Sequence, residues 1–265
     1  MQKPISRPIV LCLSGHDPVG GAGTQADIEA ISAQGCHAAV AVTALTVQDT
    51  VDVSGFRLVD TDWVMAQAQA IINDLPVSAI KLGMLGSLEM VDCIVEIAKQ
   101  LPNIPLICDP VLRAGGGGSL GPDDVGYAMR EKIMPLARLI TPNLPEARIL
   151  AELAEGSADQ CAQVLLKYCP NVLITGGHGD QAQVHNRLYC QDGSLHDFTC
   201  PRLPGEYHGS GCTLASTLAA RLALGEELSS AVNSALDYTW RCLRDAEAPG
   251  RGQYIPRRLP LDYCN

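Results

Sequence analysis

Short apolar runs alternate with longer amphipathic segments along the first two thirds of the chain. The apolar runs are nearly continuous, which is typical of strands buried on both faces of a parallel sheet. The segments between them have apolar residues at helical spacing. Ser157 and Gln160 form a capping-box pattern at the start of the last such segment. We expect strands at residues 9–14, 38–45, 79–83, 105–109, 137–141 and 171–175, and helices at residues 23–35, 60–74, 87–100, 122–134 and 157–168.

The last third of the chain has a different pattern. Two β-type runs within residues 184–200 flank the pair Asp192-Gly193, which predicts a hairpin. Two helices are expected at about residues 211–224 and 228–247, and the Pro- and Arg-rich tail is expected to wrap over the surface. We therefore predict one α/β domain over residues 1–265, with a central, mostly parallel sheet and helices on both faces.

The acidic composition narrows the classes of partner. The net charge is −10 and the pI is near 5.0, which argues against nucleic acid and against an anionic membrane surface as partners. No apolar run reaches the length of a membrane span, and the first ten residues contain no apolar signal-peptide core. The eleven cysteines are scattered singly without zinc-site spacing, so we expect a reduced, cytoplasmic protein.

Five polar segments follow the expected strands or open a helix, and ligands of open parallel sheets bind at that edge. They are "SGHDPVGGAG", "DPVLRAGGGG", "TPNLPEA", "TGGHGD" and "YHGSGC". Residues 21–26 fit a loose dinucleotide fingerprint. The loop is long, however, and no acidic residue ends the second strand, so we do not favour a nicotinamide or flavin site. A Walker A motif is absent, because Gly21 stands where its lysine belongs.

The most distinctive segment is Gly209-Ser210-Gly211-Cys212, which precedes an alanine-rich helical run. The first N–H groups of a helix have no partners within the helix, and glycines allow an anion to approach them. A thiol at that end of the helix dipole is expected to have a lowered pKa. We therefore predict an anion hole at Gly209, Gly211 and Cys212, with Cys212 as a stabilised thiolate. The alternative is a small residue that packs at a helix start.

Two carboxylates follow expected strands. Asp109 ends one strand, and Glu146 follows the strand that ends at Thr141. Carboxylates at such positions suit Mg²⁺, which binds a few protein oxygens together with substrate phosphates. Their alternatives are loop capping for Asp109 and a helix-start charge for Glu146. Together with an anion hole, these carboxylates favour phosphoryl transfer.

Seven motifs in order give the chain a family resemblance. It resembles the hydroxymethylpyrimidine/phosphomethylpyrimidine kinases, the thiamine-pathway members of the ribokinase-like superfamily, over about residues 9–224. The motifs are "LSGHDPVGGAGTQAD", "AVTALTVQDT", "KLGML", "DPV", "TPNLPEA", "GGH" and "HGSGCTLAS".

The resemblance implies a cytoplasmic enzyme, commonly a homodimer, with the ribokinase-like fold. It implies ATP-dependent phosphorylation of 4-amino-5-hydroxymethyl-2-methylpyrimidine and then of its monophosphate, with Mg²⁺ at Asp109 and Glu146. Cys212 takes the place of the aspartate base of sugar-kinase relatives, beside Gly209 and Gly211. The implied pyrimidine-pocket residues are Gln48, Asp27, Met84, Gly15, Ala22 and Val111. The implied nucleotide-side residues are Asn143, Thr175, Thr213 and Arg113.

The chain departs from the family pattern at two lysines. Thr175 stands where many members have lysine before "GGH", and "RAGGGGS" replaces a lysine-containing loop after "DPV". Arg113 is the local substitute that we expect, and it should matter most for the already anionic monophosphate. Two alternatives stay open: a pyridoxal kinase, which shares the fold and the helix start, and a pyrimidine-binding regulator without catalysis.

Overall fold

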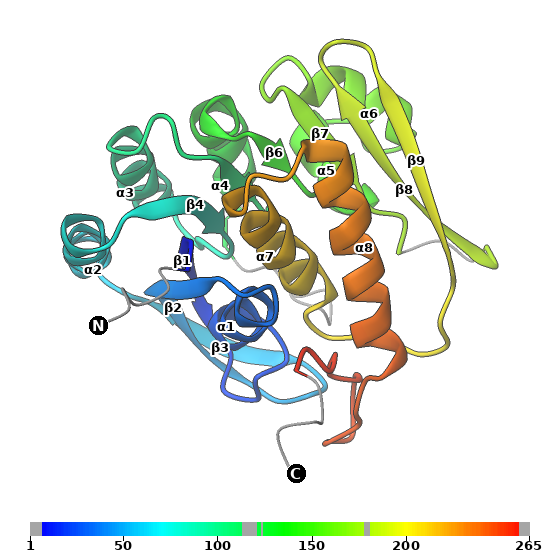
Figure 1. The fold of residues 1–265 in the computed structure, drawn as a ribbon, viewed down its shortest axis with the longest axis horizontal. Coiled ribbons are helices and arrows are strands. Elements are labelled where there is room, and N and C mark those ends of the chain that lie inside the picture. The colour runs from blue at the N-terminus through cyan, green and yellow to red at the C-terminus, as the bar shows by residue number, and fades with distance from the viewer. Residues whose placement is uncertain (1–6, 113–120, 123, 178–180, 260–265) are drawn as a thin grey trace, which may run out of the picture.

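The computed structural model describes residues 7–112, 121–122, 124–177 and 181–259. These residues build a nine-stranded sheet in the order β3-β2-β1-β4-β5-β6-β7-β8-β9. The strands from β2 to β7 in that order run parallel, which confirms the predicted α/β fold with a mostly parallel sheet (Figure 1). The strands are β1 (Ile9–His16), β2 (His37–Gln48), β3 (Val53–Leu58), β4 (Val77–Leu82), β5 (Leu106–Cys108), β6 (Leu139–Ile140), β7 (Asn171–Ile174), β8 (Gln183–Cys190) and β9 (Leu195–Pro201).

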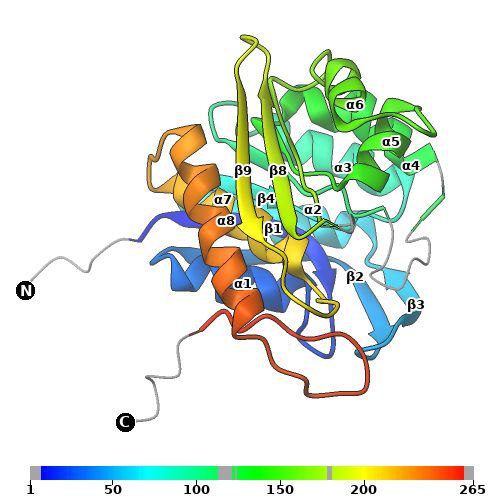
Figure 2. The same cartoon turned by 90° about the vertical axis from the view of Figure 1, so that its right-hand side faces the viewer.

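Both edges of the sheet are antiparallel. The predicted hairpin is confirmed as β8 and β9, which lie beside helix α8 (Leu228–Arg244) in Figure 2. At the other edge, β3 pairs with β2 and was not expected. This pairing extends β2 to Gln48, which pairs with Val53. The expectation that the second strand ends at residue 45 was therefore wrong, and Gln48 belongs to the strand end.

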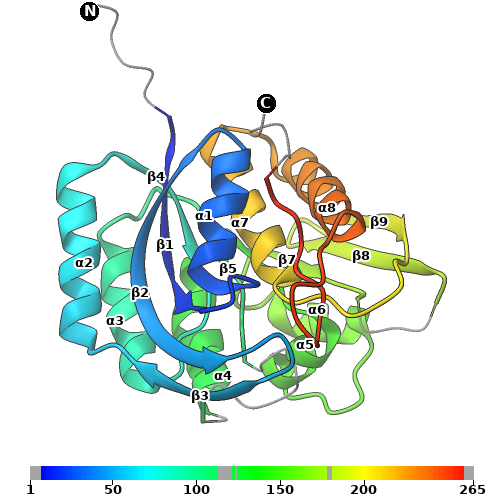
Figure 3. The same ribbon diagram turned by 90° about the horizontal axis from the view of Figure 1, so that it is seen from below.

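Helices cover both faces of the sheet, as Figure 3 shows. The helices of one face are α2 (Thr61–Asp74), α3 (Leu88–Lys99), α4 (Asp124–Ala128), α5 (Leu144–Ala151) and α6 (Ala158–Leu165). Those of the other face are α1 (Gly23–Ala33), α7 (Ser210–Ala223) and α8 (Leu228–Arg244). In the described part of the chain, no helix combines the length and apolar character needed to cross a membrane.

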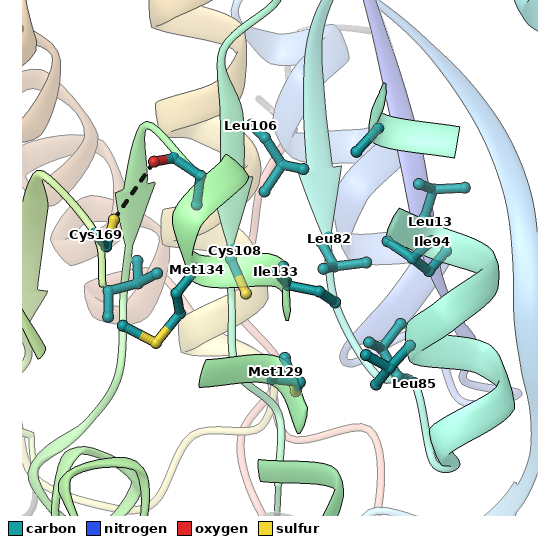
Figure 4. Close-up of a cluster of buried hydrophobic side chains, with 14 of the residues drawn as sticks. Leu13, Leu82, Leu85, Ile94, Leu106, Cys108, Met129, Ile133, Met134 and Cys169 are labelled. Atoms are coloured by element: carbon teal, nitrogen blue, oxygen red, sulfur yellow. Dashed lines mark hydrogen bonds between the residues drawn. The ribbon is translucent and has the colours of Figure 1, made fainter. Parts of the chain in front are cut away.

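The largest hydrophobic core lies between the sheet and the helices α2 to α6. Figure 4 shows Leu13 of β1 and Leu82 of β4 close to Ile94 of α3, with Met129 and Ile133 on the same side of the sheet. Burial of each such side chain stabilises the fold by about 1.5–3 kcal/mol. The helix expected at residues 122–134 is shorter than predicted. The α-helix ends at residue 128, and the chain then forms a π turn and a 3₁₀ turn through residue 136.

Two helices begin with capping boxes. The predicted box of Ser157 and Gln160 is confirmed at α6. A second box, of Asn143 and Glu146, opens α5 inside a segment that we expected to be a loop. Each box satisfies two backbone donors that a helix start leaves without partners. The second box also fixes two predicted site residues in place.

Candidate active site

The predicted ligand-binding segments gather at the carboxyl edge of the parallel strands. Asp109 follows β5, and its N–H donates to the carbonyl of Leu82 at the end of β4. Asn143 and Thr175 follow β6 and β7 and form a parallel bridge with each other. By contrast, a cavity of about 340 Å³ lies near the start of β7, at the opposite ends of the strands, and contains none of the predicted site residues. The carboxyl edge therefore remains the candidate site.

Two glycines bring the loop after β1 against the start of α7. Gly209 is the N-cap of α7 with φ +80°, and a Cβ there would lie 1.9 Å from the carbonyl oxygen of Gly21. Gly23 has φ +55°, and a Cβ there would lie 2.2 Å from the carbonyl oxygen of Gly15. Both positions exclude any other residue without backbone movement. Both glycines are therefore needed for close backbone packing at this edge.

The first turn of α7 is oriented as an anion hole requires. The helical ladder begins with the bond from Thr213 N–H to the Gly209 carbonyl, at 3.0 Å. The preceding N–H groups of residues 210–212 belong to the open end of the helix. A Cβ on Gly211 would lie only 3.7 Å from Oδ1 of Asp109. The open helix end and the carboxylate of Asp109 therefore face the same small region.

The protonation state predicted for Cys212 was wrong. Burial raises the pKa of this thiol to about 12; nearby Lys81 acts in the opposite direction, whereas Asp109 and Asp27 raise the pKa further. Desolvation and the two carboxylates both disfavour the thiolate that the sequence argument expected. Cys212 is a neutral thiol in the free protein, and it hydrogen-bonds to Asp109.

Asp109 and Glu146 form an electrostatically unfavourable pair. Burial raises the pKa of Asp109 to about 6, against the effect of Lys81, and Asp27 contributes to the increase. Burial and the charge of Asp109 raise the pKa of Glu146 to about 8. Oδ2 of Asp109 is buried without a hydrogen-bond partner. A buried carboxylate oxygen without a partner, next to a second carboxylate, fits a divalent cation.

The donor set limits which cation fits. Among the described residues, no group of three or more His, Cys, Asp or Glu residues could hold a metal. Mg²⁺ is commonly bound by one or two carboxylates together with waters and substrate phosphates. The residues present therefore fit Mg²⁺ that arrives with a nucleotide, and they do not form a complete protein site.

Three of the six predicted pyrimidine-pocket residues, Met84, Gly15 and Val111, lie together. Met84 and Ala44 form a small buried cluster, and Val111 packs against it. A Cβ on Gly15 would lie 3.4 Å from the Met84 sulfur, so a glycine leaves room beside it. Gln48 of the neighbouring strand β2 is half-buried. Ala22 lies in the loop before α1, where its N–H donates to Asp17 at 2.7 Å.

Asp27 lies behind this pocket instead of lining it. Its side chain is fully buried, and Ser14 and Ser216 each donate a hydrogen bond to it. Lys81 lies 2.9 Å from Asp27 Oδ1, and both side chains are fully buried. Burial works against the charge of Lys81, but Asp27 and Asp109 hold its pKa above the ordinary value. Lys81 is thus a fixed cation behind the site. Its place within the apolar run "AIKLG" was the sequence signal for it.

The nucleotide-side residues divide into three cases. Asn143 and Thr175 are adjacent, as the parallel bridge requires. Thr213 is fully buried; its hydroxyl donates to the Gly209 carbonyl at 2.8 Å and accepts from Arg258 at 2.8 Å. These two bonds hold the Thr213 hydroxyl within the fold, and a contact of Thr213 with a nucleotide stays a prediction. Arg113 lies outside the described residues.

Comparison with known proteins identifies the relatives of this arrangement. Residues 17–257 match the family described as phosphomethylpyrimidine kinase. A hydroxymethylpyrimidine/phosphomethylpyrimidine kinase of Haemophilus influenzae is 37% identical over 237 residues, which are 86% of this chain and 88% of that protein. A thiamine biosynthesis bifunctional protein of Geobacter sulfurreducens is 37% identical over 260 residues, which are 95% of this chain and 52% of that protein. An ADP complex of Bacillus subtilis pyridoxal kinase has a TM-score of 0.88 at 25% identity, covering 97% of this chain and all of that one.

Proposed function

Because this chain belongs to the phosphomethylpyrimidine kinase family, we propose that it phosphorylates 4-amino-5-hydroxymethyl-2-methylpyrimidine with ATP, and then phosphorylates the monophosphate to the diphosphate. The product is the pyrimidine precursor of thiamine, the pathway named in one of the relatives. The observation that carries the proposal is the open first turn of α7, which faces the unpartnered buried oxygen of Asp109.

In this proposal, some residues bind the pyrimidine and the nucleotide, and others stabilise the charge of the phosphates. The N–H groups of residues 210–212 hold the transferred phosphoryl group, where preformed donors need no reorganisation. Asp109 and Glu146 hold Mg²⁺, which neutralises charge on the phosphates when it is bound. Asn143 and Thr175 bind the nucleotide phosphates. Gly15, Met84 and Val111 enclose the pyrimidine, and the Gln48 amide reads its edge.

Cys212 has a revised role in this proposal. A neutral thiol cannot accept the proton of the substrate hydroxymethyl group, and phosphoryl transfer has a loose transition state that demands little from a base. We assign the Cys212 side chain to placing the hydroxymethyl oxygen beside the helix N–H groups. Proton acceptance would require a thiolate, which burial disfavours in the free protein.

Pyridoxal kinase activity is the second candidate. The B. subtilis pyridoxal kinase resembles this chain closely in structure but shares only 25% identity, whereas the H. influenzae pyrimidine kinase shares 37%. We therefore expect pyridoxal to be the poorer substrate. We further propose a cytoplasmic homodimer, in keeping with the family resemblance.

A substrate panel tests the function. The protein is incubated with ATP and Mg²⁺ and with the hydroxymethylpyrimidine, its monophosphate or pyridoxal, and the phosphates on each product are counted. We expect the hydroxymethylpyrimidine to gain two phosphates in succession and its monophosphate to gain one, and pyridoxal to react more slowly. Faster turnover of pyridoxal than of both pyrimidines would favour the second candidate. ATP binding without transfer to any substrate would favour a regulator.

A further inference from the structure

His208 is the residue directly before the N-cap of α7, and its side chain reaches the loop after β1. Nε2 of its ring lies 3.1 Å from Oδ2 of Asp17. The Asp17 carboxylate also accepts the N–H of Val19 at 2.9 Å and the N–H of Ala22 at 2.7 Å. The side chains of His208 and Asp17 are only 14% and 3% exposed, so water has little access to the bond between them. The pair joins two segments that are 191 residues apart in the chain.

The charge of Asp17 sets the direction of this bond. Burial raises the pKa of the carboxyl group, but the hydrogen bonds that it receives, led by the one from His208, outweigh burial and lower the pKa to about 2. An ionised carboxylate can only accept hydrogen bonds. His208 therefore carries a proton on Nε2 and donates it to a charged acceptor, which makes the bond stronger than one between neutral groups.

Gly21 leaves the space that the ring of His208 fills. A Cβ at residue 21 would lie 2.3 Å from Cδ2 of His208 and 3.4 Å from Oδ2 of Asp17. The backbone of Gly209 approaches the carbonyl oxygen of the same glycine, as described above. The ring of His208 and the backbone of Gly209 therefore both pack on Gly21, and no larger residue fits there while the ring stays at Asp17.

These contacts lie between two parts of the proposed site. The loop after β1 includes Ala22, which belongs to the pyrimidine side, and Gly209 opens the helix end that holds the phosphoryl group. Transfer requires the acceptor oxygen and the phosphoryl group at a fixed separation, and an error of about 1 Å can cost about a hundredfold in rate. A buried contact between the two parts holds this separation.

We propose that His208 is a positioning residue for phosphoryl transfer, whose hydrogen bond to Asp17 fixes the first turn of α7 relative to the loop that borders the pyrimidine. The inference rests on the proposed function, because the two parts share a task only if the pyrimidine accepts the phosphoryl group. His208 is assigned no contact with either substrate. Its removal should therefore lower kcat and leave the KM for each substrate nearly unchanged.

Four variants of the full chain test this role. His208→Ala removes the donor, whereas His208→Gln keeps an N–H group on a side chain of similar reach. Gly21→Ala keeps His208 but puts a methyl group in the space of its ring. The fourth variant combines Gly21→Ala with His208→Ala. The loop keeps another anchor in all four, because Arg258 still donates to the carbonyl oxygens of Gly20 and Gly21.

We expect His208→Ala to lower kcat for the hydroxymethylpyrimidine by tenfold or more, while the KM for the pyrimidine and for ATP stay within about threefold. His208→Gln should recover a large part of the lost rate. Gly21→Ala should lower kcat similarly, because its methyl group displaces the ring from Asp17. Added to His208→Ala, the same methyl group has only Oδ2 of Asp17 near it, so it should change kcat less than about twofold.

The matched control is His185→Ala. Nδ1 of His185 lies 3.0 Å from Oδ2 of Asp197, so this variant also removes a hydrogen bond between a histidine and an aspartate, here between β8 and β9. It should leave kcat and both KM values near those of the parent. A loss of kcat as large as that of His208→Ala would show that the assay reports any disturbed pair, and it would overturn the proposal.

Three further results would contradict the proposed role. They are an unchanged kcat in His208→Ala, a rise of both KM values as large as the fall of kcat, and an equal effect of Gly21→Ala with and without His208. A parent protein that phosphorylates no pyrimidine would instead reject the proposed function, so the two failures are distinguishable.

A second comparison decides the question if His208→Ala does not fold. His208→Met and His208→Gln place side chains of similar length at this position, but only glutamine can donate a hydrogen bond to Asp17. The proposal expects kcat of His208→Gln to exceed that of His208→Met by about fivefold or more, at similar KM values. Equal kcat values would show that the hydrogen bond has no part in positioning the helix end.

Discussion

At the scale of single residues, Cys212 shows how burial can reverse an expectation from sequence. The helix start suggested a thiolate, whereas desolvation and two neighbouring carboxylates hold the pKa of this thiol at about 12. At pH 7.5 only about one molecule in ten thousand or fewer then carries the thiolate, which is the form that reacts with alkylating reagents.

We therefore predict that Cys212 is alkylated slowly in the free enzyme. With iodoacetamide at pH 7.5 and a chelator present, modification should be at least a hundredfold slower than that of a small free thiol. Peptide-level mass spectrometry measures the rate for Cys212 separately from the other cysteines. Cys190, which is half-buried like Cys212, serves as an internal reference within the same protein. Modification of Cys212 at the rate of a free thiol would show that the helix dipole prevails after all.

The pKa of Asp17 is shifted in the opposite direction from that of Cys212: it is lowered from 3.8 to about 2. A lowered pKa means that the unfolded chain binds more protons than the folded chain between those values. The stabilisation by Asp17 is therefore complete above about pH 4 and is lost as the pH falls toward 2. The size of the shift corresponds to about 2 kcal/mol.

Urea unfolding of the parent and of Asp17→Asn at pH 6, 3 and 2 measures this contribution. We expect Asp17→Asn to lower the free energy of unfolding at pH 6 by about 2 kcal/mol, and the difference to shrink toward zero at pH 2. Asp49→Asn should show a smaller effect, because solvent screens that exposed side chain. A difference between parent and Asp17→Asn that persists at pH 2 would mean that the substitution damages the loop for reasons other than charge.

At the scale of elements, the capping box of α5 combines a structural and a functional task. Glu146 accepts the N–H of Asn143 at 3.0 Å, and it also belongs to the carboxylate pair. Gln160 holds the same position in the capping box of α6, where it accepts the N–H of Ser157 at 2.9 Å. Gln160 is exposed, so α6 offers a matched control for α5.

Three substitutions separate the two tasks of Glu146. Glu146→Gln keeps the cap and removes the charge, so it should lower kcat by tenfold or more without loss of thermal stability. Glu146→Ala should lower kcat similarly and also cost about 1 kcal/mol of stability. Gln160→Ala should cost about the same stability with kcat unchanged. If Glu146→Gln keeps the parent kcat, Glu146 is only a cap and the Mg²⁺ assignment is left with Asp109 alone.

The elements that the sequence analysis predicted well are those with strong periodicity. Continuous apolar strands and amphipathic helices identified the parallel sheet, and strand-end loops indicated where Asp109, Asn143 and Thr175 would meet. Strand β3, "VSGFRL", was missed because it is an edge strand without a continuous buried side. Its pairing, in turn, decides where β2 ends and how Gln48 is placed. A pattern within one segment cannot report a partner that comes later in the chain.

At the scale of the whole molecule, the residues that sequence reasoning missed are those held by distant contacts. Charged side chains are expected at the surface, yet Lys81 is fully buried against Asp27. Arg258 lies in the tail that we expected to wrap over the surface, and it is also buried. Apart from Thr213, the partners of its guanidinium are more than 200 residues away along the chain.

Arg258 joins the tail to the loop after β1 and to the start of α7. Its guanidinium donates to the carbonyl oxygens of Gly20 and Gly21, to the carboxylate of Glu29 at 3.1 Å and to the hydroxyl of Thr213 at 2.8 Å. A planar group with several fixed donors suits this arrangement better than a lysine would. The tail therefore holds together two segments that form the candidate site.

We predict that Arg258→Ala destabilises the protein by about 3 kcal/mol or more, because it leaves buried carbonyl oxygens and a carboxylate without their partner. Arg258→Lys should lose part of this stability, since it keeps the charge but not the planar set of donors. Arg251 in the same tail is the control: its side chain is 84% exposed and pairs with Asp49, so Arg251→Ala should cost under about 1 kcal/mol.

Urea unfolding gives the stabilities, and the KM for the pyrimidine, measured below the unfolding transition, should rise for Arg258→Ala and stay constant for Arg251→Ala. Equal stabilities and equal KM values for the two alanine variants would show that the tail covers the site without organising it.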